Sequence, residues 1–303
     1  MELLKKLCSI HAPSGNESAM TNFVLDYVKK NSKNWKSKPV IHSGKGFQDC
    51  IVLVFGKPRT AIFAHLDSIG FTVRYGKELV KIGGPRTKNN YALTGSDSKG
   101  KIECKLKVDA KENISYVFNR EIERGTDLVF KTNFREDKNF VQCCYMDNRL
   151  GVWNALKVAE TLKDGIIAFS CWEEHGGGSV EYLGRFIYEK YNVSQALISD
   201  ISWITNGVQH AKGPVISMRD RGIPRKSYIN KIIEIAKKSN VPFQLEVEGS
   251  GGSDGLSLQH SPYPFDWCFV GAAEENVHSP DEKVHKKDIE SMVNLYKVLM
   301  EKL

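Results

Sequence analysis

The chain has 303 residues, of which 41% are hydrophobic and 26% are charged, and its formal net charge is +7. These values are ordinary for a globular protein and leave room for one large domain or two. The sequence excludes a helical membrane protein, because no apolar stretch is long enough to cross a bilayer. Residues 1–10 form an amphipathic pattern rather than a signal peptide, so we expect a cytoplasmic protein without a membrane partner.

The positive charge and the cysteines each exclude a further class of protein. Lysine and arginine are spread along the chain and mixed with acids, without a basic stripe, so we expect no nucleic-acid partner. The seven cysteines include the adjacent Cys143 and Cys144 and lack paired metal-binding spacing. They are therefore expected to be reduced core residues rather than a disulfide framework.

The first 64 residues predict two helices and then two strands. Leucines at positions 3, 4 and 7 indicate the first helix. Ser14, with Glu17 three residues later, is a capping-box signal for the second helix. Residues 49–55 and 60–64 are typical of strands on either side of a Gly-Lys-Pro turn.

The second of these strands leads directly into His65 and Asp67. Residues two apart share one face of an extended chain. This spacing suits an aspartate that supports a metal-binding histidine. For an isolated motif, however, a histidine satisfied by its neighbour is the commoner outcome.

Residues 68–139 have a different character, because no helical period occurs in them. Residues 101–108 alternate strictly between polar and apolar, and short β-like runs lie on both sides. We predict a small, barrel-like all-β domain here, inserted into an α/β domain that is formed by residues 1–67 and 140–303.

In residues 140–303, acids and a histidine follow the predicted strands. They are Asp147 after 140–145, Glu173 and Glu174 after 165–169, Asp200 after 196–199, and His278 after 267–271. Open α/β sheets bind ligands beyond the carboxyl ends of their strands, so we expect these side chains to meet.

Together with His65, these residues form a mixed nitrogen and oxygen donor set. Such a set suits zinc, cobalt or manganese rather than a structural cysteine site. The donors suffice for two ions that share one bridging carboxylate, with one acid left over. An acid outside the ligand set can act as a general base, so the pattern predicts a metal-dependent hydrolase.

The sequence resembles the glutamyl aminopeptidase and deblocking aminopeptidase family, which includes tetrahedral-shell peptidases and some proteins labelled as cellulases. The resemblance covers nearly the whole chain. It rests on Ala64–Asp67, Ile69–Phe71, Asp147–Arg149, Glu173–Glu174, Ser199–Asp200, Ser253–Asp254 and His278–Pro280. It implies a three-layer α/β/α, zinc-peptidase-like domain, whose inserted β-domain acts as a lid or in oligomerisation and gives dimers or dodecamers.

The resemblance also implies a reaction and a role for each site residue. Its members remove N-terminal residues from peptides with a free N-terminus, and two divalent ions are expected, with zinc favoured over cobalt or manganese. By this similarity, Asp147 bridges the ions, Glu174 and His278 hold one, and His65 and Asp200 hold the other. Glu173 would be the general base and Asp67 the support for His65.

Three departures from the family pattern concern the surroundings of this site. Ser68 stands where the family usually has Glu, at a position outside the metal set. His175 replaces a small apolar residue, and we expect it to point to solvent. Glu274 and Glu275 lie where the family usually has an arginine and an aromatic residue. As a negative rim they would favour a basic N-terminal residue, whereas a solvated pair of charges is the commoner outcome.

Three alternative functions stay open at this point. A related metal-dependent carboxypeptidase or aminoacylase has the same ligand order, but its extra domain typically lies between the last acidic ligand and the final histidine. A glycosidase would use Glu173 or Glu174 with a second carboxylate and no metal. A non-catalytic metal-binding protein could keep the same fold.

Overall fold

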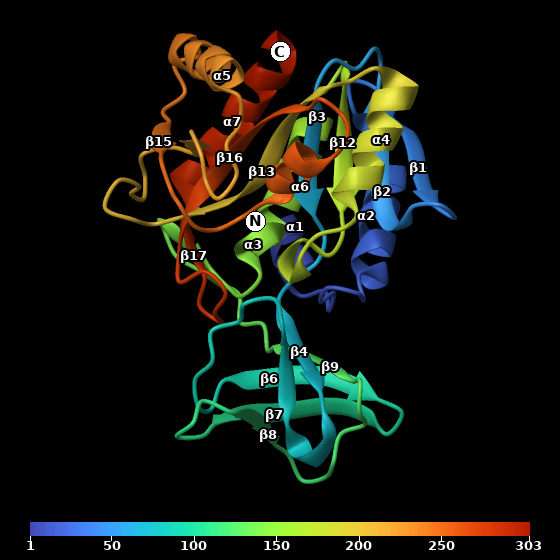
Figure 1. Ribbon diagram of the computed structural model, residues 1–303, viewed down its shortest axis with the longest axis vertical. Helices are drawn as coiled ribbons and strands as arrows, with labels where there is room; N and C mark the ends of the chain where they lie inside the picture. The colour runs from blue at the N-terminus through green and yellow to red at the C-terminus, as the bar shows by residue number, and fades with distance from the viewer.

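The computed structural model describes residues 1–303, which form a large lobe and a small lobe joined by a narrow waist (Figure 1). The large lobe is built on an eleven-stranded sheet, and the small lobe on a six-stranded sheet. None of the helices is both long and apolar enough to pass through a lipid bilayer. All seven cysteines are buried and free of disulfide bonds, as predicted.

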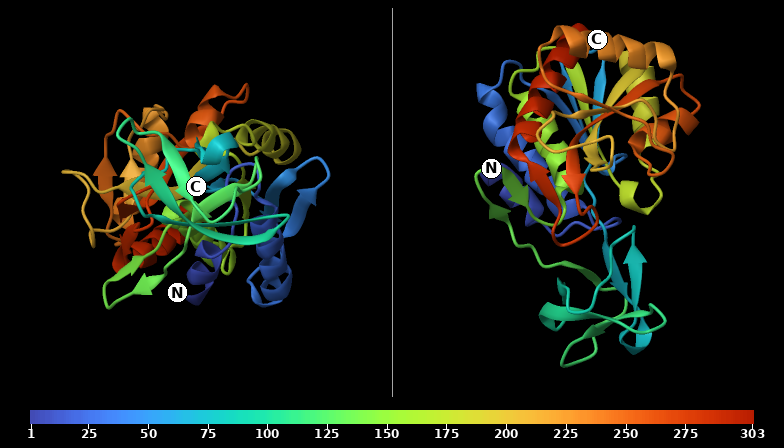
Figure 2. Two further views of the ribbon diagram at one scale, coloured as in Figure 1. Left: turned by 90° about the horizontal axis from the view of Figure 1, so that it is seen from below. Right: turned by 90° about the vertical axis from the view of Figure 1, so that its left-hand side faces the viewer.

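The large lobe contains seven α-helices. They are α1 (Glu2–Cys8), α2 (Ser18–Asn31), α3 (Met146–Ala159), α4 (Val180–Tyr191), α5 (Lys226–Lys238), α6 (Asp254–His260) and α7 (Lys286–Lys302). Helices α3 and α7 pack together on one side of the sheet and α4 and α6 on the other (Figure 2, right). Apolar residues of the helices and of both sheets form one core of 79 buried side chains. The three-layer α/β/α arrangement is therefore confirmed.

Eleven strands form the large sheet. They are β1 (Val40–Gly44), β2 (Gln48–Phe55), β3 (Ala61–His65), β10 (Arg135–Glu136), β11 (Phe140–Gln142), β12 (Gly165–Ser170), β13 (Gln195–Trp203), β14 (Val215–Ser217), β15 (Gln244–Glu246), β16 (Asp266–Glu275) and β17 (Lys283–His285). The main path runs β1-β2-β12-β3-β13-β16-β17-β11-β10, and β14 and β15 branch from β16.

The four central strands, β12, β3, β13 and β16, are parallel to one another. Their carboxyl ends therefore lie at one edge of the sheet. Ser170 pairs with His65 across β12 and β3, and Asp200 pairs with Gly271 across β13 and β16. Every residue of β12 is buried, which agrees with its apolar sequence. This register brings the predicted site residues to a common edge.

The small lobe consists of six antiparallel strands. They are β4 (Gly70–Val73), β5 (Leu79–Ile82), β6 (Ala92–Asp97), β7 (Gly100–Val108), β8 (Ile114–Val117) and β9 (Asp127–Phe130), in the order β5-β4-β9-β6-β7-β8. Along β7, buried residues alternate with exposed ones, as the sequence pattern predicted. A bridge between Glu78 and Ser115 brings the two edge strands together, so the sheet is a nearly closed barrel.

Three local expectations need correction. Helix α2 begins at Ser18, and Ser14 is not its cap, because the Ser14 hydroxyl donates to Asp67 instead. Asp200 lies inside β13 rather than beyond its end. Strand β10, which falls within the residues predicted to form the insert, pairs with β11 of the large sheet.

Candidate metal centre

The predicted site residues converge at the carboxyl edge of the parallel strands. Two groups of side chains have ligand atoms within 4.8 Å of one another, and each is suited to hold an ion. The first consists of His65, Asp147 and Asp200, and the second of Asp147, Glu174 and His278. Asp147 belongs to both groups, so the arrangement has the form of two adjacent sites with one shared carboxylate.

The two oxygens of Asp147 face different histidines. Asp147 Oδ1 lies 3.2 Å from Nε2 of His65, and Oδ2 lies 3.4 Å from Nε2 of His278. Asp200 Oδ2 lies 3.6 Å from the same nitrogen of His65, and Glu174 Oε2 lies 3.1 Å from that of His278. Each histidine therefore has one carboxylate of its own in addition to the shared one.

The donors have the properties expected of ligands. His65 is 1% exposed, yet neither of its ring nitrogens makes a hydrogen bond, and Oε1 of Glu174 is also buried without a partner. Unpaired buried polar atoms are costly, and a bound cation would satisfy them. Imidazole nitrogens and carboxylate oxygens together suit a divalent transition metal, so the residues fit the metal ions of a metallopeptidase.

The charge distribution also favours cations. Burial raises the pKa of Glu173 and of Asp200 well above the ordinary carboxyl range. Burial acts to lower the pKa of His278, but Asp147 and Glu174 overcome it and raise that pKa to about 12. Protons and cations would therefore compete for these carboxylates. Metal binding would displace such protons, which makes the affinity dependent on pH.

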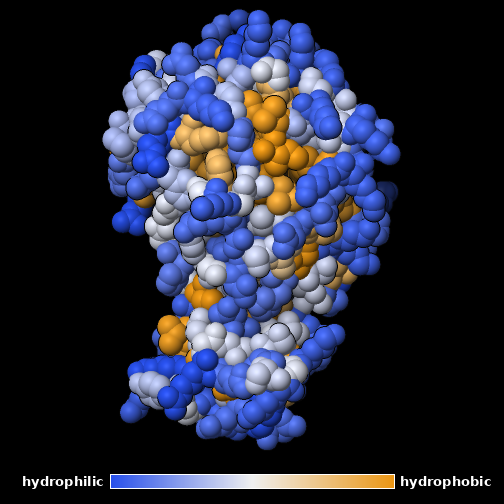
Figure 3. Space-filling view, turned by 90° about the vertical axis from the view of Figure 1, so that its right-hand side faces the viewer, coloured by the Kyte–Doolittle hydropathy of each residue, from blue (hydrophilic) through white to orange (hydrophobic).

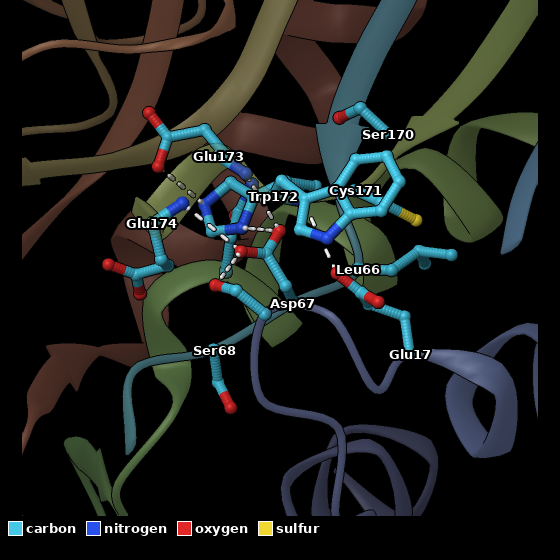
Figure 4. Close-up of polar contacts among 12 residues, drawn as sticks. Glu17, Leu66, Asp67, Ser68, Ser170, Cys171, Trp172, Glu173 and Glu174 are labelled. Carbon is cyan, nitrogen blue, oxygen red and sulfur yellow. Dashed lines mark hydrogen bonds and ion pairs between the residues drawn. The ribbon is translucent and has the colours of Figure 1, made fainter. Parts of the chain in front are cut away.

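Asp67 lies beneath the cluster and is completely buried. Its carboxylate accepts a hydrogen bond from the Ser14 hydroxyl at 2.6 Å. It also accepts from the backbone N–H groups of Glu173 and Glu174, each at 3.1 Å (Figure 4). Asp67 Oδ1 also lies 3.4 Å from Nδ1 of His65. Asp67 is therefore placed to orient the histidine, and it fixes the turn that carries both glutamates.

Glu173 is the acid outside the two ligand groups. It begins the 3₁₀ turn η3 (Glu173–His175), and its Oε2 lies 3.8 Å from Nε2 of His65. The side chain is 18% exposed and lines a cavity of about 270 Å³ together with Asp147, Glu174, Asp200 and His278. A carboxylate in this position can exchange protons with a molecule in the cavity.

The small lobe contacts the site through the segment that follows β5. The backbone N–H of Gly83 donates to Nδ1 of His175 at 3.0 Å. The Gly84 carbonyl lies 3.1 Å from Nδ1 of His278, and the N–H of Arg86 donates to the His278 carbonyl at 2.9 Å. A proton on Nδ1 that is shared with Gly84 leaves Nε2 of His278 free to bind a metal. His175 is exposed, as expected, but it also anchors the small lobe.

Two supporting residues had no assigned role in the sequence prediction. The fully buried Arg149 donates to the carbonyls of Leu66 and Asp67, with the second of these bonds at 3.2 Å. The buried Glu282 accepts from the backbone N–H of His278 at 2.9 Å and from that of Asp147 at 3.3 Å. Both residues hold the backbone of site residues. The sequence offered only a family motif for Arg149 and no signal for Glu282.

Glu274 and Glu275 form neither a negative rim nor the solvated pair of charges that was the commoner outcome. Glu274 is 1% exposed, and both of its carboxylate oxygens are buried without a partner. Glu275 lies 3.2 Å from Lys283 and 3.6 Å from His210. Neither glutamate lines the cavity at the metal centre. The strand β16 is longer than predicted and carries both residues away from it.

The fold and the clustered donors define a metal-dependent hydrolase. The family model of the M42 glutamyl aminopeptidases matches residues 86–295. The chain therefore belongs to the M42 glutamyl aminopeptidase family, and it is a metal-dependent aminopeptidase, a hydrolase of peptide bonds.

Similar proteins cover nearly the whole chain. A curated relative from Acetivibrio thermocellus, provisionally named an aminopeptidase, is 23% identical and spans 97% of this chain and 96% of its own. Aminopeptidase APDkam598 from Desulfurococcus kamchatkensis has 21% identity and a TM-score of 0.85, covering 100% of this chain and 94% of that chain. The TET1 peptidase of Pyrococcus horikoshii has 22% identity and a TM-score of 0.84, with 100% and 99% covered.

A substitution at Gly83 tests whether the small lobe supports metal binding. Gly83 has φ +67°, and an added Cβ would lie 2.9 Å from the Glu174 carbonyl oxygen. We expect Gly83→Ala to displace the contacts with His175 and His278 and to weaken metal binding about 10- to 100-fold, measured by competition with a chromogenic chelator. Gly76→Ala is the control, because Gly76 also has positive φ but an added Cβ would meet nothing within 4 Å. Equal affinities in the two variants would show that the contact is irrelevant.

Proposed function

We propose that this aminopeptidase uses two divalent ions, zinc in preference to cobalt or manganese, to remove N-terminal residues from peptides. The observation that carries the proposal is the pair of donor groups that share Asp147. His65 and Asp200 would hold one ion, Glu174 and His278 would hold the other, and Asp147 would bind both. When bound, the ions would polarise the scissile carbonyl and lower the pKa of a water molecule.

Glu173 would act as the general base. It lines the cavity, it lies outside both donor groups, and burial raises its pKa well above that of an ordinary carboxyl. It would take a proton from the attacking water and return it to the leaving amine, so one group serves both steps. Asp67 would act indirectly, because its hydrogen bonds to the η3 backbone fix where the Glu173 side chain begins.

The position of the small lobe favours an aminopeptidase over a carboxypeptidase or aminoacylase. The six-stranded sheet is formed between His65 and Asp147 in the sequence. The span from Asp200 to His278 instead supplies β14, α5, β15 and α6 to the large lobe. A glycosidase is not favoured, because Glu174 belongs to a group of metal-type donors and Glu173 lies directly beside His65 of the other group.

We also propose that the chain forms a homo-oligomer, a dimer or a dodecamer, through the insert formed by residues 68–139. The TET1 peptidase of Pyrococcus horikoshii can assemble into a tetrahedron or a large octahedral shell. In the small lobe, Tyr75, Val80 and Val117 are 51%, 51% and 57% exposed. They lie near the junction of β5 and β8. The face of the small lobe that Figure 3 shows is otherwise mostly hydrophilic. Exposed apolar residues of this kind suit a protein interface.

Metal removal tests the function. After dialysis against a chelator, we expect hydrolysis of amino-acid amides to stop, and zinc, cobalt or manganese should restore it because the ions supply the polarising charge. N-acylated amino acids should not be hydrolysed before or after this treatment. Full activity in a sample that is free of metal would contradict the proposal. Preference for N-acylated substrates would indicate the aminoacylase alternative.

Glu173→Gln tests the general base. The variant keeps the size of the side chain but cannot accept the proton, so we expect kcat to fall by about 10² to 10⁴. Metal content, measured by mass spectrometry, should remain that of the unaltered protein. Glu181→Gln, at an exposed position of α4, serves as the control and should leave both quantities unchanged. The assignment is wrong if Glu173→Gln retains full activity.

The oligomer is tested by light scattering with size-exclusion chromatography. We expect a mass of two or twelve times 34.1 kDa. Val80→Lys and Val117→Lys together place charges on the exposed apolar positions and should reduce that mass, because buried unpaired charges destabilise an interface. A single-chain mass for the unaltered protein at micromolar concentration would refute this proposal and leave the catalytic one intact.

A further inference from the structure

The cavity at the metal centre has a second wall, which the proposed reaction does not use. This acidic wall is formed by Ser202, Ser217, Asp220, Glu246 and Glu248. It lies at the ends of β13, β14 and β15 and in the segments that follow β14 and β15. Seven of the sixteen residues that line the cavity are acids, and none is lysine or arginine.

The buried polar groups of the acidic wall have only uncharged neighbours. Ser217 and Glu246 pair in register across β14 and β15, and they are 2% and 7% exposed. Glu246 Oε1 accepts from Ser202, and the Ser217 hydroxyl lies beside the same carboxylate. A buried carboxylate that lines a cavity and meets only hydroxyl groups indicates a polar ligand.

The carboxylates of the acidic wall form no ion pair within the chain. Asp220, Glu246 and Glu248 form no ion pair with any lysine, arginine or histidine. Asp220 accepts from the backbone N–H of Gly222 at 2.5 Å and from the Ser253 hydroxyl at 3.4 Å, which are both uncharged donors. Ions at the metal centre would offset the carboxylates of the opposite wall only. A ligand for the acidic wall should therefore carry positive charge.

An aromatic surface lies next to these acids. Trp203 lines the same cavity and is 39% exposed, and its indole ring lies 3.3 Å from the position that a Cβ on Gly251 would occupy. Lysine and arginine combine a long apolar stem with a terminal cation. An exposed indole beside carboxylates suits both parts of such a side chain, because the ring can contact the stem and attract the cation through a cation–π interaction.

We propose that the acidic wall selects peptides whose N-terminal residue has a cationic side chain, lysine or arginine. The proposal rests on the proposed function, because the metal centre would hold the scissile amide in the same cavity. The side chain would extend along Trp203, with its charged end between Glu246, Glu248 and Asp220. The substrates would thus be peptides with a basic N-terminal residue. The acids that select them would be those of the acidic wall and not Glu274 and Glu275, which the sequence suggested as a rim.

The test compares kcat/KM for the p-nitroanilides of lysine, arginine, leucine and glutamate on the metal-loaded enzyme. We expect lysine and arginine to exceed leucine by about 10- to 100-fold, the effect of one charge-assisted contact, and glutamate to be the poorest substrate. Glu246→Gln and, separately, Glu248→Gln should lower the lysine-to-leucine ratio by about tenfold. Glu248→Lys should lower the ratio further, because it places a like charge beside the substrate. Glu248 is only partly buried, so its variants keep the test valid if Glu246→Gln fails to fold.

Glu275→Gln is the matched control, because Glu275 is an acid of the same lobe whose carboxylate pairs with Lys283 outside the cavity. It should leave the ratio unchanged. The proposal is overturned if leucine matches lysine in the unaltered enzyme, or if the variants slow all substrates equally, which would mean that the wall binds the α-ammonium group. The proposal is also overturned if the unaltered enzyme binds a third equivalent of metal that Glu246→Gln does not bind, because the acidic wall would then be a metal site. If only the leucine anilide is hydrolysed, the aminopeptidase function stands and the proposed selectivity is wrong. If no anilide is hydrolysed, the function and the selectivity are both contradicted.

Discussion

The buried carboxylate of Asp67 is the group on which the geometry of the centre depends. It connects three segments that are distant in sequence, through Ser14 of the N-terminal segment, His65 at the end of β3 and the backbone of η3 after β12. Burial acts to raise the pKa of Asp67, but the contacts with His65 and Ser14 keep it below its ordinary value. The carboxylate therefore stays ionised, and loss of any one partner would leave a buried charge incompletely bonded.

Parallel strands bring the donors to one edge, but the two lobes together fix their orientation. The large lobe supplies every donor, from β3 and β13 and from the segments that follow β11, β12 and β16. The small lobe supplies no donor, yet its Gly84 carbonyl meets Nδ1 of His278 and its Gly83 N–H meets His175. Any rotation of the small lobe would alter these contacts. Metal affinity and the position of the small lobe are therefore linked through the same few hydrogen bonds.

The sequence predicted that these side chains would meet, because they follow a rule about strands, and it predicted their surroundings poorly, because loops follow no such rule. Apolar runs indicated the strands, and the polar residues that follow them indicated the edge of the sheet where the parallel strands end. Left-handed backbone conformations occur at Tyr145, Trp172 and His278, with φ between 62° and 68°. The hydrophobic period of the sequence does not reveal them, because residues in this conformation are usually glycine. These conformations aim Asp147 and the η3 turn. The pattern around Ser14 predicts a helix cap, because a local pattern cannot reveal a partner 53 residues away.

Strand β13 carries residues of both the metal centre and the acidic wall. Asp200 and Ser202 are two residues apart on β13 and so share a face of it. Asp200 approaches His65, and Ser202 donates to Glu246 on the opposite wall. Cations at the metal centre would offset the first wall, whereas no ion pair offsets the second, so the cavity would have an unequal charge distribution along its length. A substrate with a cation at its N-terminal side chain and a neutral amide next to it matches this distribution, because each part then meets the wall that complements it.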